Sequence, residues 1–131
     1  MFEESDQPIR VAVGIIHQKD RYLLCQRGMN RRYALKWEFP GGKTYPEEPL
    51  IECLKRELDE ELNIEPVKFK ELTTIRTTYP DGGDFLITYF MVTKYDGEPV
   101  NKVFEKIEWL TAAELKTYDI IEGTLPVLKF I

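Results

Sequence analysis

The alternation of apolar and polar positions predicts a chain of short strands around one long helix. Runs rich in Val, Ile, Tyr and Phe, bounded by Gly, Pro and Asp, are typical of strands with at least one buried face. These runs cover residues 9–16, 22–25, 37–39, 67–79, 85–95 and 103–110. We expect the first two to pair as an antiparallel hairpin, and we expect a turn at Pro40-Gly41-Gly42.

The long helix is predicted from Pro49 to Leu62. Pro49 suits the first helical position, because the N–H that proline lacks has no partner there. Asn63 follows the last periodic residue and tolerates the left-handed conformation that ends many helices. One stripe of the helix should face a core, because apolar side chains recur at three- and four-residue spacing. They are Leu50, Ile51, Leu54, Leu58 and Leu62.

Two shorter helices are predicted near the end of the chain. Thr111 and Glu114 have the spacing of a capping box, which opens a helix. A second helical segment should run from Leu125 or Pro126 to the last residue. Strands on both sides of a central helix, with further helices behind them, predict an α/β fold with a mixed sheet between helices. A chain of 131 residues is the size of one domain, which we place over residues 1–131.

Charge and composition narrow the classes of function. Eighteen basic and 23 acidic residues give a net charge of −5, which argues against a partner such as duplex nucleic acid, whose phosphates attract Lys and Arg. No apolar run approaches the ~20 residues that span a bilayer, and residues 1–6 lack the order of a secretory signal. Cys25 and Cys53 fit no zinc spacing. We expect a cytoplasmic protein, monomer or homodimer, that binds a small molecule and no membrane.

Three carboxylates on the long helix are the strongest chemical signal. At ~100° per residue, Glu57, Glu60 and Glu61 fall in one sector beside the apolar stripe. Such like charges at helical spacing repel, and a hard divalent cation bound through oxygens would compensate. A solvated acidic face is the alternative, and it is common. Upstream, Gly41-Gly42 offers bare backbone near the helix start, and Lys43 offers a cation for phosphate oxygens.

The same residues belong to a longer pattern that resembles the Nudix box. It reads Gly42, five residues, Glu48, seven residues, Arg56-Glu57-Leu58, one residue, Glu60-Glu61, one residue, Asn63-Ile64, with Asn63 in place of the late glycine. The run from Trp37 to Lys43 is similar to the MutT-like branch of that superfamily, although Tyr45 stands where many of those relatives have Glu. The resemblance implies a Nudix-type α/β/α sandwich. It also implies hydrolysis of a nucleoside triphosphate to a nucleoside monophosphate and pyrophosphate. The substrate implied is an oxidised or otherwise modified nucleotide, or a pyrimidine nucleotide similar to CTP.

The resemblance further implies residue roles. Glu57, Glu60 and Arg56 are the expected catalytic set: Glu57 activates water, and Arg56 orients a glutamate through a charge-assisted pair. The cofactor is Mg²⁺ or Mn²⁺. The ligands implied are Glu57, Glu60, Glu61, the Gly42 carbonyl, Glu48 in the outer shell, and Glu105 as substitute for a late-loop glutamate whose place falls on Val103.

Substrate contacts are less specific. The expected contacts are Arg27 and Lys43 for phosphate, Phe39 as a wall of the base pocket, and Thr124 near a base-reading position. The alternatives are core packing for Phe39, a helix cap for Thr124 and a solvated loop for Arg27. Two other functions stay open: hydrolysis of ADP-ribose or a dinucleoside polyphosphate, and a non-catalytic nucleotide-recognition module.

Overall fold

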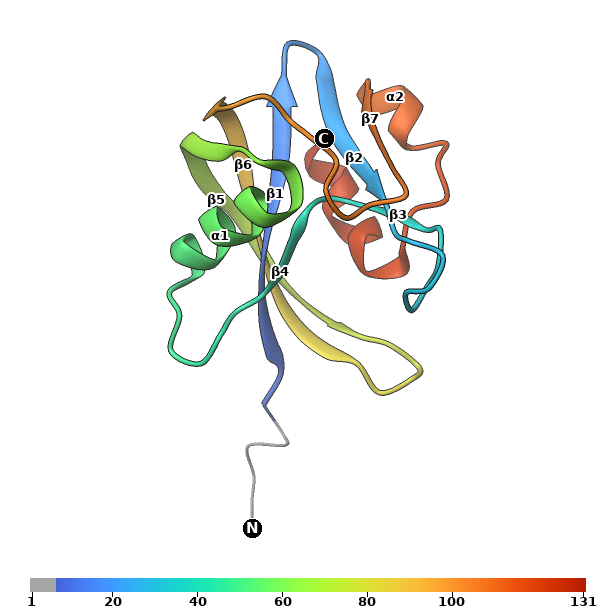
Figure 1. The fold of residues 1–131 in the computed structure, drawn as a ribbon. Coiled ribbons are helices and arrows are strands. Elements are labelled where there is room, and N and C mark those ends of the chain that lie inside the picture. Colours follow the sequence, from blue (N-terminus) through green and yellow to red (C-terminus); the bar gives the residue numbers. More distant parts are fainter. Residues whose placement is uncertain (1–6) are drawn as a thin grey trace.

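The computed structural model describes residues 7–131 as a seven-stranded sheet with helices on both faces (Figure 1). The N-terminal stretch 1–6, on which the expectation about a secretory signal rested, lies outside the described residues. The strands are β1 (Ile9–Gln18), β2 (Arg21–Gln26), β3 (Trp37–Glu38), β4 (Gly41–Lys43), β5 (Glu65–Thr78), β6 (Asp84–Asp96) and β7 (Lys106–Leu110). The helices are α1 (Leu50–Leu62), α2 (Ala112–Leu115) and the 3-10 helix η2 (Glu122–Phe130).

The sheet is mixed, as predicted. Its main order is β3-β2-β1-β6-β5, with β4 also paired to β1 and β7 to β2. β1 and β6 run parallel, and the other pairs are antiparallel. The predicted hairpin of β1 and β2 is present but pairs at only two positions, and β2 also pairs with β7 over five positions, from Tyr22 to Gln26.

Two apolar cores lie on opposite faces of the sheet. α1 packs Leu54, Leu58 and Leu62 against one face, and α2 and η2 pack Leu115 and Val127 against the other. In Figure 1 the green α1 and the red C-terminal helices accordingly lie on different sides of the strands. This arrangement confirms the α/β/α sandwich. Among residues 7–131, no helix is long and apolar enough to cross a bilayer.

The structure corrects the predicted turn at Gly41-Gly42. These glycines form β4, which pairs antiparallel with β1 at Ala12 and Val13. A Cβ atom at Gly41 would lie 2.2 Å from the Ala12 carbonyl oxygen, so only glycine lets the two backbones approach this closely.

The starts of three elements differ from prediction, and one residue of the predicted apolar stripe is exposed. Pro49 is the N-cap of α1, with an extended ψ of 148°, instead of its first helical residue. Ile51 is 44% exposed and lies outside the buried stripe. β7 starts at Lys106 because the Asn101 side chain closes a turn onto the backbone of Phe104. The last helix starts earlier than expected, at Glu122, and is of the 3-10 type.

Candidate active site

Three glutamates of α1 line one side of a cavity of about 790 Å³. The buried stripe of α1 fixes the rotation of the helix, so that Glu57, Glu60 and Glu61 extend over β4. A Cβ atom at Gly42 would lie 2.4 Å from the carboxyl carbon of Glu57. Glycine at this position therefore makes the room in which the Glu57 carboxylate lies.

Arg56 connects the glutamates to the loop before α1. Its Nε and one terminal nitrogen donate to both oxygens of Glu48, each at 2.9 Å. The other terminal nitrogen donates to Glu57 at 2.8 Å and to Glu60 at 3.3 Å. The guanidinium also donates to the Lys43 carbonyl oxygen at 3.0 Å. These charge-assisted bonds hold two of the three glutamates in place, so the expected orienting role of Arg56 has a geometric basis.

Two carboxyl groups of the site, those of Glu48 and Glu61, have pKa values that are shifted for separate reasons. Hydrogen bonds from Arg56 lower the pKa of Glu48 to about 2, and the same contacts raise the pKa of Arg56. Burial raises the pKa of Glu61 well above its ordinary value, and neighbouring Glu57 raises it further. The backbone N–H of Gly41 donates to Glu61 at 3.1 Å and partly offsets this effect. Glu61 is thus a buried carboxyl beside a second carboxylate, and a backbone N–H donates to it.

The donor chemistry of this cluster fits a hard divalent cation. Carboxylate oxygens are the ligands that Mg²⁺ and Mn²⁺ prefer, and Glu57, Glu60 and Glu61 present them on one wall of the cavity. Among residues 7–131, no three His, Cys, Asp or Glu side chains are already gathered at metal-binding geometry. The reason lies in the hydrogen bonds: Arg56 holds Glu57 and Glu60, and the Gly41 N–H holds Glu61. A cation would replace part of these contacts.

The far end of the cavity is apolar and lies between the sheet and η2. Phe39 is only 4% exposed; it belongs to the core and also lines the cavity. Thr124 lines the same end and is buried. It is not a helix cap, because η2 begins after Ile121.

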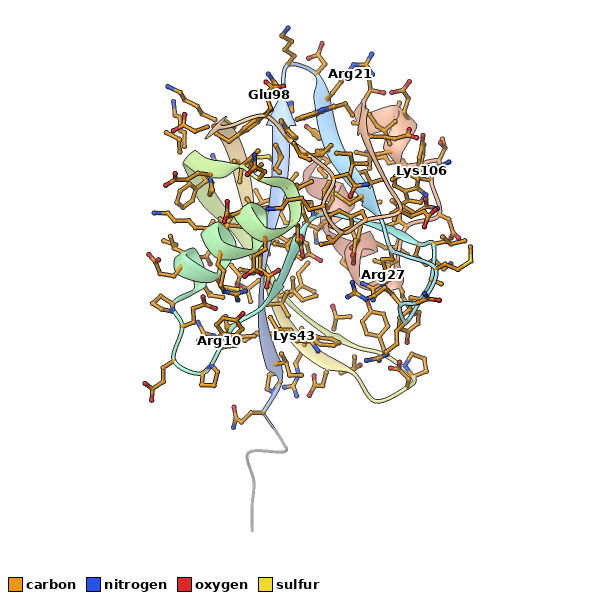
Figure 2. The ribbon with its side chains drawn as sticks, in the orientation of Figure 1. Arg10, Arg21, Arg27, Lys43, Glu98 and Lys106 are labelled. Atoms are coloured by element: carbon orange, nitrogen blue, oxygen red, sulfur yellow. The ribbon has the colours of Figure 1, made fainter. Side chains whose placement is uncertain are left out.

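Two predicted basic residues also line the cavity. Figure 2 shows Arg27 after β2 and Lys43 at the end of β4, both in the lower half of the view. One terminal nitrogen of Arg27 donates to both oxygens of Glu38, at 3.0 and 3.2 Å. Arg27 is therefore held by an internal partner and is not a freely solvated loop residue.

Three predicted metal ligands are placed less favourably. Glu105 is exposed and lies outside the cavity lining, since its backbone follows the edge of β2 through a hydrogen bond to Gln26. The structure therefore does not bring Glu105 to the glutamate cluster. Both oxygens of Glu48 accept from Arg56, and the Gly42 carbonyl accepts from the Cys53 thiol at 3.3 Å.

Several cavity residues were not predicted from the sequence. Glu38 has a pKa that burial raises and Arg27 lowers. Tyr79 accepts a hydrogen bond from the Gly123 N–H at 2.9 Å, and its ring lies 4.9 Å from that of Tyr33. A charged Glu38 between the aromatic residues Trp37 and Phe39 was a usable signal, since a buried charge needs a partner. Tyr79 carried no such signal.

Comparison with known proteins agrees with this geometry. The NUDIX domain family matches residues 7–129, and the chain belongs to that family. The 8-oxo-dGTP diphosphatase of Escherichia coli (strain K12) is 30% identical over 92% of this chain and 93% of its own length. Nucleoside triphosphatase NudI of Klebsiella pneumoniae (strain 342) is 32% identical over 88% and 90%. The solution structure of the E. coli ORF135 protein matches with a TM-score of 0.83 and 28% identity, over 94% of this chain and 87% of that one.

The matches confirm the Nudix resemblance seen in the box from Gly42 to Ile64, and they confirm its MutT-like character. They cover nearly the whole chain, including the C-terminal helices, which lie outside the box.

Proposed function

We propose that this chain hydrolyses a nucleoside triphosphate to a nucleoside monophosphate and pyrophosphate with the help of Mg²⁺ or Mn²⁺. The observation that carries the proposal is the cavity itself. Three helix carboxylates, Glu57, Glu60 and Glu61, line one end of it, and a buried apolar end lies beside Phe39 and Thr124. The activities named for the 8-oxo-dGTP diphosphatase and for NudI support a nucleotide substrate, with its phosphates at the carboxylate end of the cavity and its base at the apolar end.

Hydrolysis of a phosphoanhydride requires charge neutralisation and in-line positioning of water. A divalent cation, when bound, supplies both by contacting phosphate oxygens and lowering the pKa of water. We assign Glu57, Glu60 and Glu61 as the residues that hold it. Glu48 and the Gly42 backbone support this set through Arg56 and by giving Glu57 room.

Glu57 is the residue to which we assign the proton of the attacking water, with Glu60 beside it. One oxygen of Glu57 is held by Arg56 at 2.8 Å, which fixes the carboxylate while its second oxygen accepts the proton. Lys43 adds positive charge to the cavity wall for the phosphates, and Arg27, which is paired with Glu38, lies on the same wall with its remaining N–H groups as donors. Phe39 and Thr124 bound the space for the base.

The experiment that tests this function is a substrate panel read by product identity. Ordinary, oxidised and methylated nucleoside triphosphates, ADP-ribose and a dinucleoside polyphosphate are incubated with Mg²⁺ and then with EDTA. We expect one triphosphate to exceed the others about 100-fold in kcat/KM, which is about 2.7 kcal/mol of transition-state discrimination. We expect EDTA to abolish its hydrolysis.

Matched variants of one helix test the site. Glu57→Gln should lower kcat at least about 100-fold while nucleotide still binds. Glu52→Gln, on the exposed side of α1, should change nothing. A preference for ADP-ribose would contradict the proposed substrate class. Tight nucleotide binding by the unaltered protein without hydrolysis would contradict the proposal that it is an enzyme.

A further inference from the structure

Arg56 has no free hydrogen-bond donor among its contacts, so only the faces of its guanidinium plane can be approached. Its five N–H groups are all engaged by the bonds to Glu48, Glu57, Glu60 and the Lys43 carbonyl, and one terminal nitrogen also lies 3.7 Å from the Cys53 sulfur. The arrangement depends on the plane being held at one angle, because rotation of the guanidinium would break bonds to three glutamates, Glu48, Glu57 and Glu60.

The ring of Tyr45 covers one face of that plane. Its centroid lies 3.8 Å from the Arg56 Cζ atom, which is stacking distance for a cation on an aromatic face. The backbone N–H of Tyr45 donates to Glu48 at 3.0 Å. Tyr45 therefore contacts both members of the Glu48–Arg56 ion pair, one through its ring and the other through its backbone.

Packing in the core does not account for this ring. Tyr45 is 57% exposed, and it also lines the cavity. An exposed tyrosine ring that stacks on the Arg56 guanidinium shields the hydrogen bonds between Arg56 and the glutamates from water and thereby strengthens them. Its hydroxyl takes part in none of these contacts, so the aromatic face is the part that matters.

We infer that Tyr45 is a positioning residue for the hydrolytic site: it fixes the plane of Arg56 and, through Arg56, the carboxylates of Glu57 and Glu60. The inference rests on the proposed function, which assigns those glutamates their task.

The first test compares two substitutions at one position. Tyr45→Leu removes the aromatic face and should lower kcat about tenfold with KM for the nucleotide within about twofold. Tyr45→Phe keeps the face and should retain the full rate. The melting temperature should stay near that of the unaltered protein in both variants, because the side chain is mostly exposed. Phe130→Leu is the matched control, since Phe130 is an exposed ring with a lysine over it, on the outer part of η2.

The second test asks whether Tyr45 acts through Arg56. In an Arg56→Lys background, which lacks the flat guanidinium, Tyr45→Leu should cost less than about twofold in kcat. A full further tenfold loss would show that Tyr45 acts independently and would overturn the inference. So would unchanged kcat for Tyr45→Leu alone.

A spectroscopic readout separates this inference from the proposed function. The Arg56 Nε–Hε proton, identified by its loss in Arg56→Lys, should be shifted upfield by the Tyr45 ring current. Tyr45→Leu should abolish the shift, and Tyr45→Phe should keep it. An unshifted proton overturns the stacking even in an active enzyme. If the shift is present and no triphosphate is hydrolysed, the proposed function fails while the position of Tyr45 stands.

Discussion

At the scale of single residues, the Arg27–Glu38 pair has an effect on stability that can be measured. The two side chains keep only 15% and 22% of their exposure, and burial raises the pKa of Glu38 while Arg27 lowers it. Arg27→Met removes the compensating charge. We expect a loss of about 2 kcal/mol near pH 7, below the ~3–5 kcal/mol of a fully buried pair because some exposure remains.

The sign of the pH dependence follows from the direction of the shift. Without Arg27 the pKa of Glu38 rises further, because burial costs less free energy for a protonated carboxyl than for a charged one. The stability of Arg27→Met should therefore recover as the pH falls from 8 to 5, measured by urea unfolding. Arg27→Met with Glu38→Gln should be stable and insensitive to pH in this range. A deficit that is constant with pH would contradict the assignment to Glu38.

Gly42 is the second residue with a specific prediction. A methyl group there must displace the Glu57 carboxylate, which would lie 2.4 Å away. Because a side chain can move where backbone cannot, Gly42→Ala should fold with nearly unchanged melting temperature but lose about tenfold or more in kcat. Gly28→Ala is the matched control, since its nearest contact would be an ordinary 3.7 Å. Full activity of Gly42→Ala would show that Glu57 need not occupy its present position.

At the scale of elements, the end of α1 is under mild strain. Asn63 adopts the left-handed conformation, with φ 61° and ψ 37°. Its N–H donates to the Asp59 carbonyl at 3.0 Å, and the next N–H, of Ile64, donates to the Leu58 carbonyl at 3.4 Å. Asn63→Gly should raise the free energy of unfolding by about 0.5 kcal/mol, and Asn63→Ala should lower it by about 1 kcal/mol. Urea midpoints at constant slope measure both. Equal stability of the Ala and Gly variants would exclude backbone strain as the cause.

The helix and the two long strands could be predicted from the sequence because their signals are local. The apolar stripe and Asn63 place α1 correctly to within a residue at each end, and the capping box at Thr111 is present with both of its hydrogen bonds. β4 could not be predicted, because Gly41-Gly42 reads locally as a turn. Only the approach of β1, from thirty positions earlier in the chain, makes those glycines a strand.

At the scale of the whole molecule, the site combines segments that the sequence leaves far apart. The box could be recognised because its residues share one helix and one loop, so spacing alone aligns Glu57, Glu60 and Glu61. The opposite wall of the cavity could not be recognised from the sequence, because Thr124 of η2 and Tyr79, which follows β5, come together only after the sheet has formed. The prediction for Glu105 failed for the same reason. Its position in the sequence is close to that of the expected late-loop glutamate, but its side chain does not line the cavity.

The three glutamates should couple metal binding to the stability of the whole domain. Burial and Glu57 raise the pKa of Glu61 above its ordinary 4.5. The stability that its protonated form contributes is fully present below that value and is lost as pH rises through the higher folded-state pKa. A divalent cation binds the folded cluster and not the unfolded chain, and it offsets this loss. At a concentration of 100 times Kd it should add about 2.7 kcal/mol.

Calorimetric melting with MgCl₂ and with EDTA measures the coupling. For a domain of this size the metal should raise Tm by roughly 10 °C, and by more at pH 8 than at pH 6, because protons and metal compete for Glu61. Glu61→Gln should melt higher than the unaltered protein in EDTA and gain little from Mg²⁺, while Glu52→Gln should behave as the unaltered protein. A metal-induced rise in Tm that is equal in all three proteins would place the cation elsewhere on the molecule, and the carboxylate cluster would then be a structural feature of α1 without a metal.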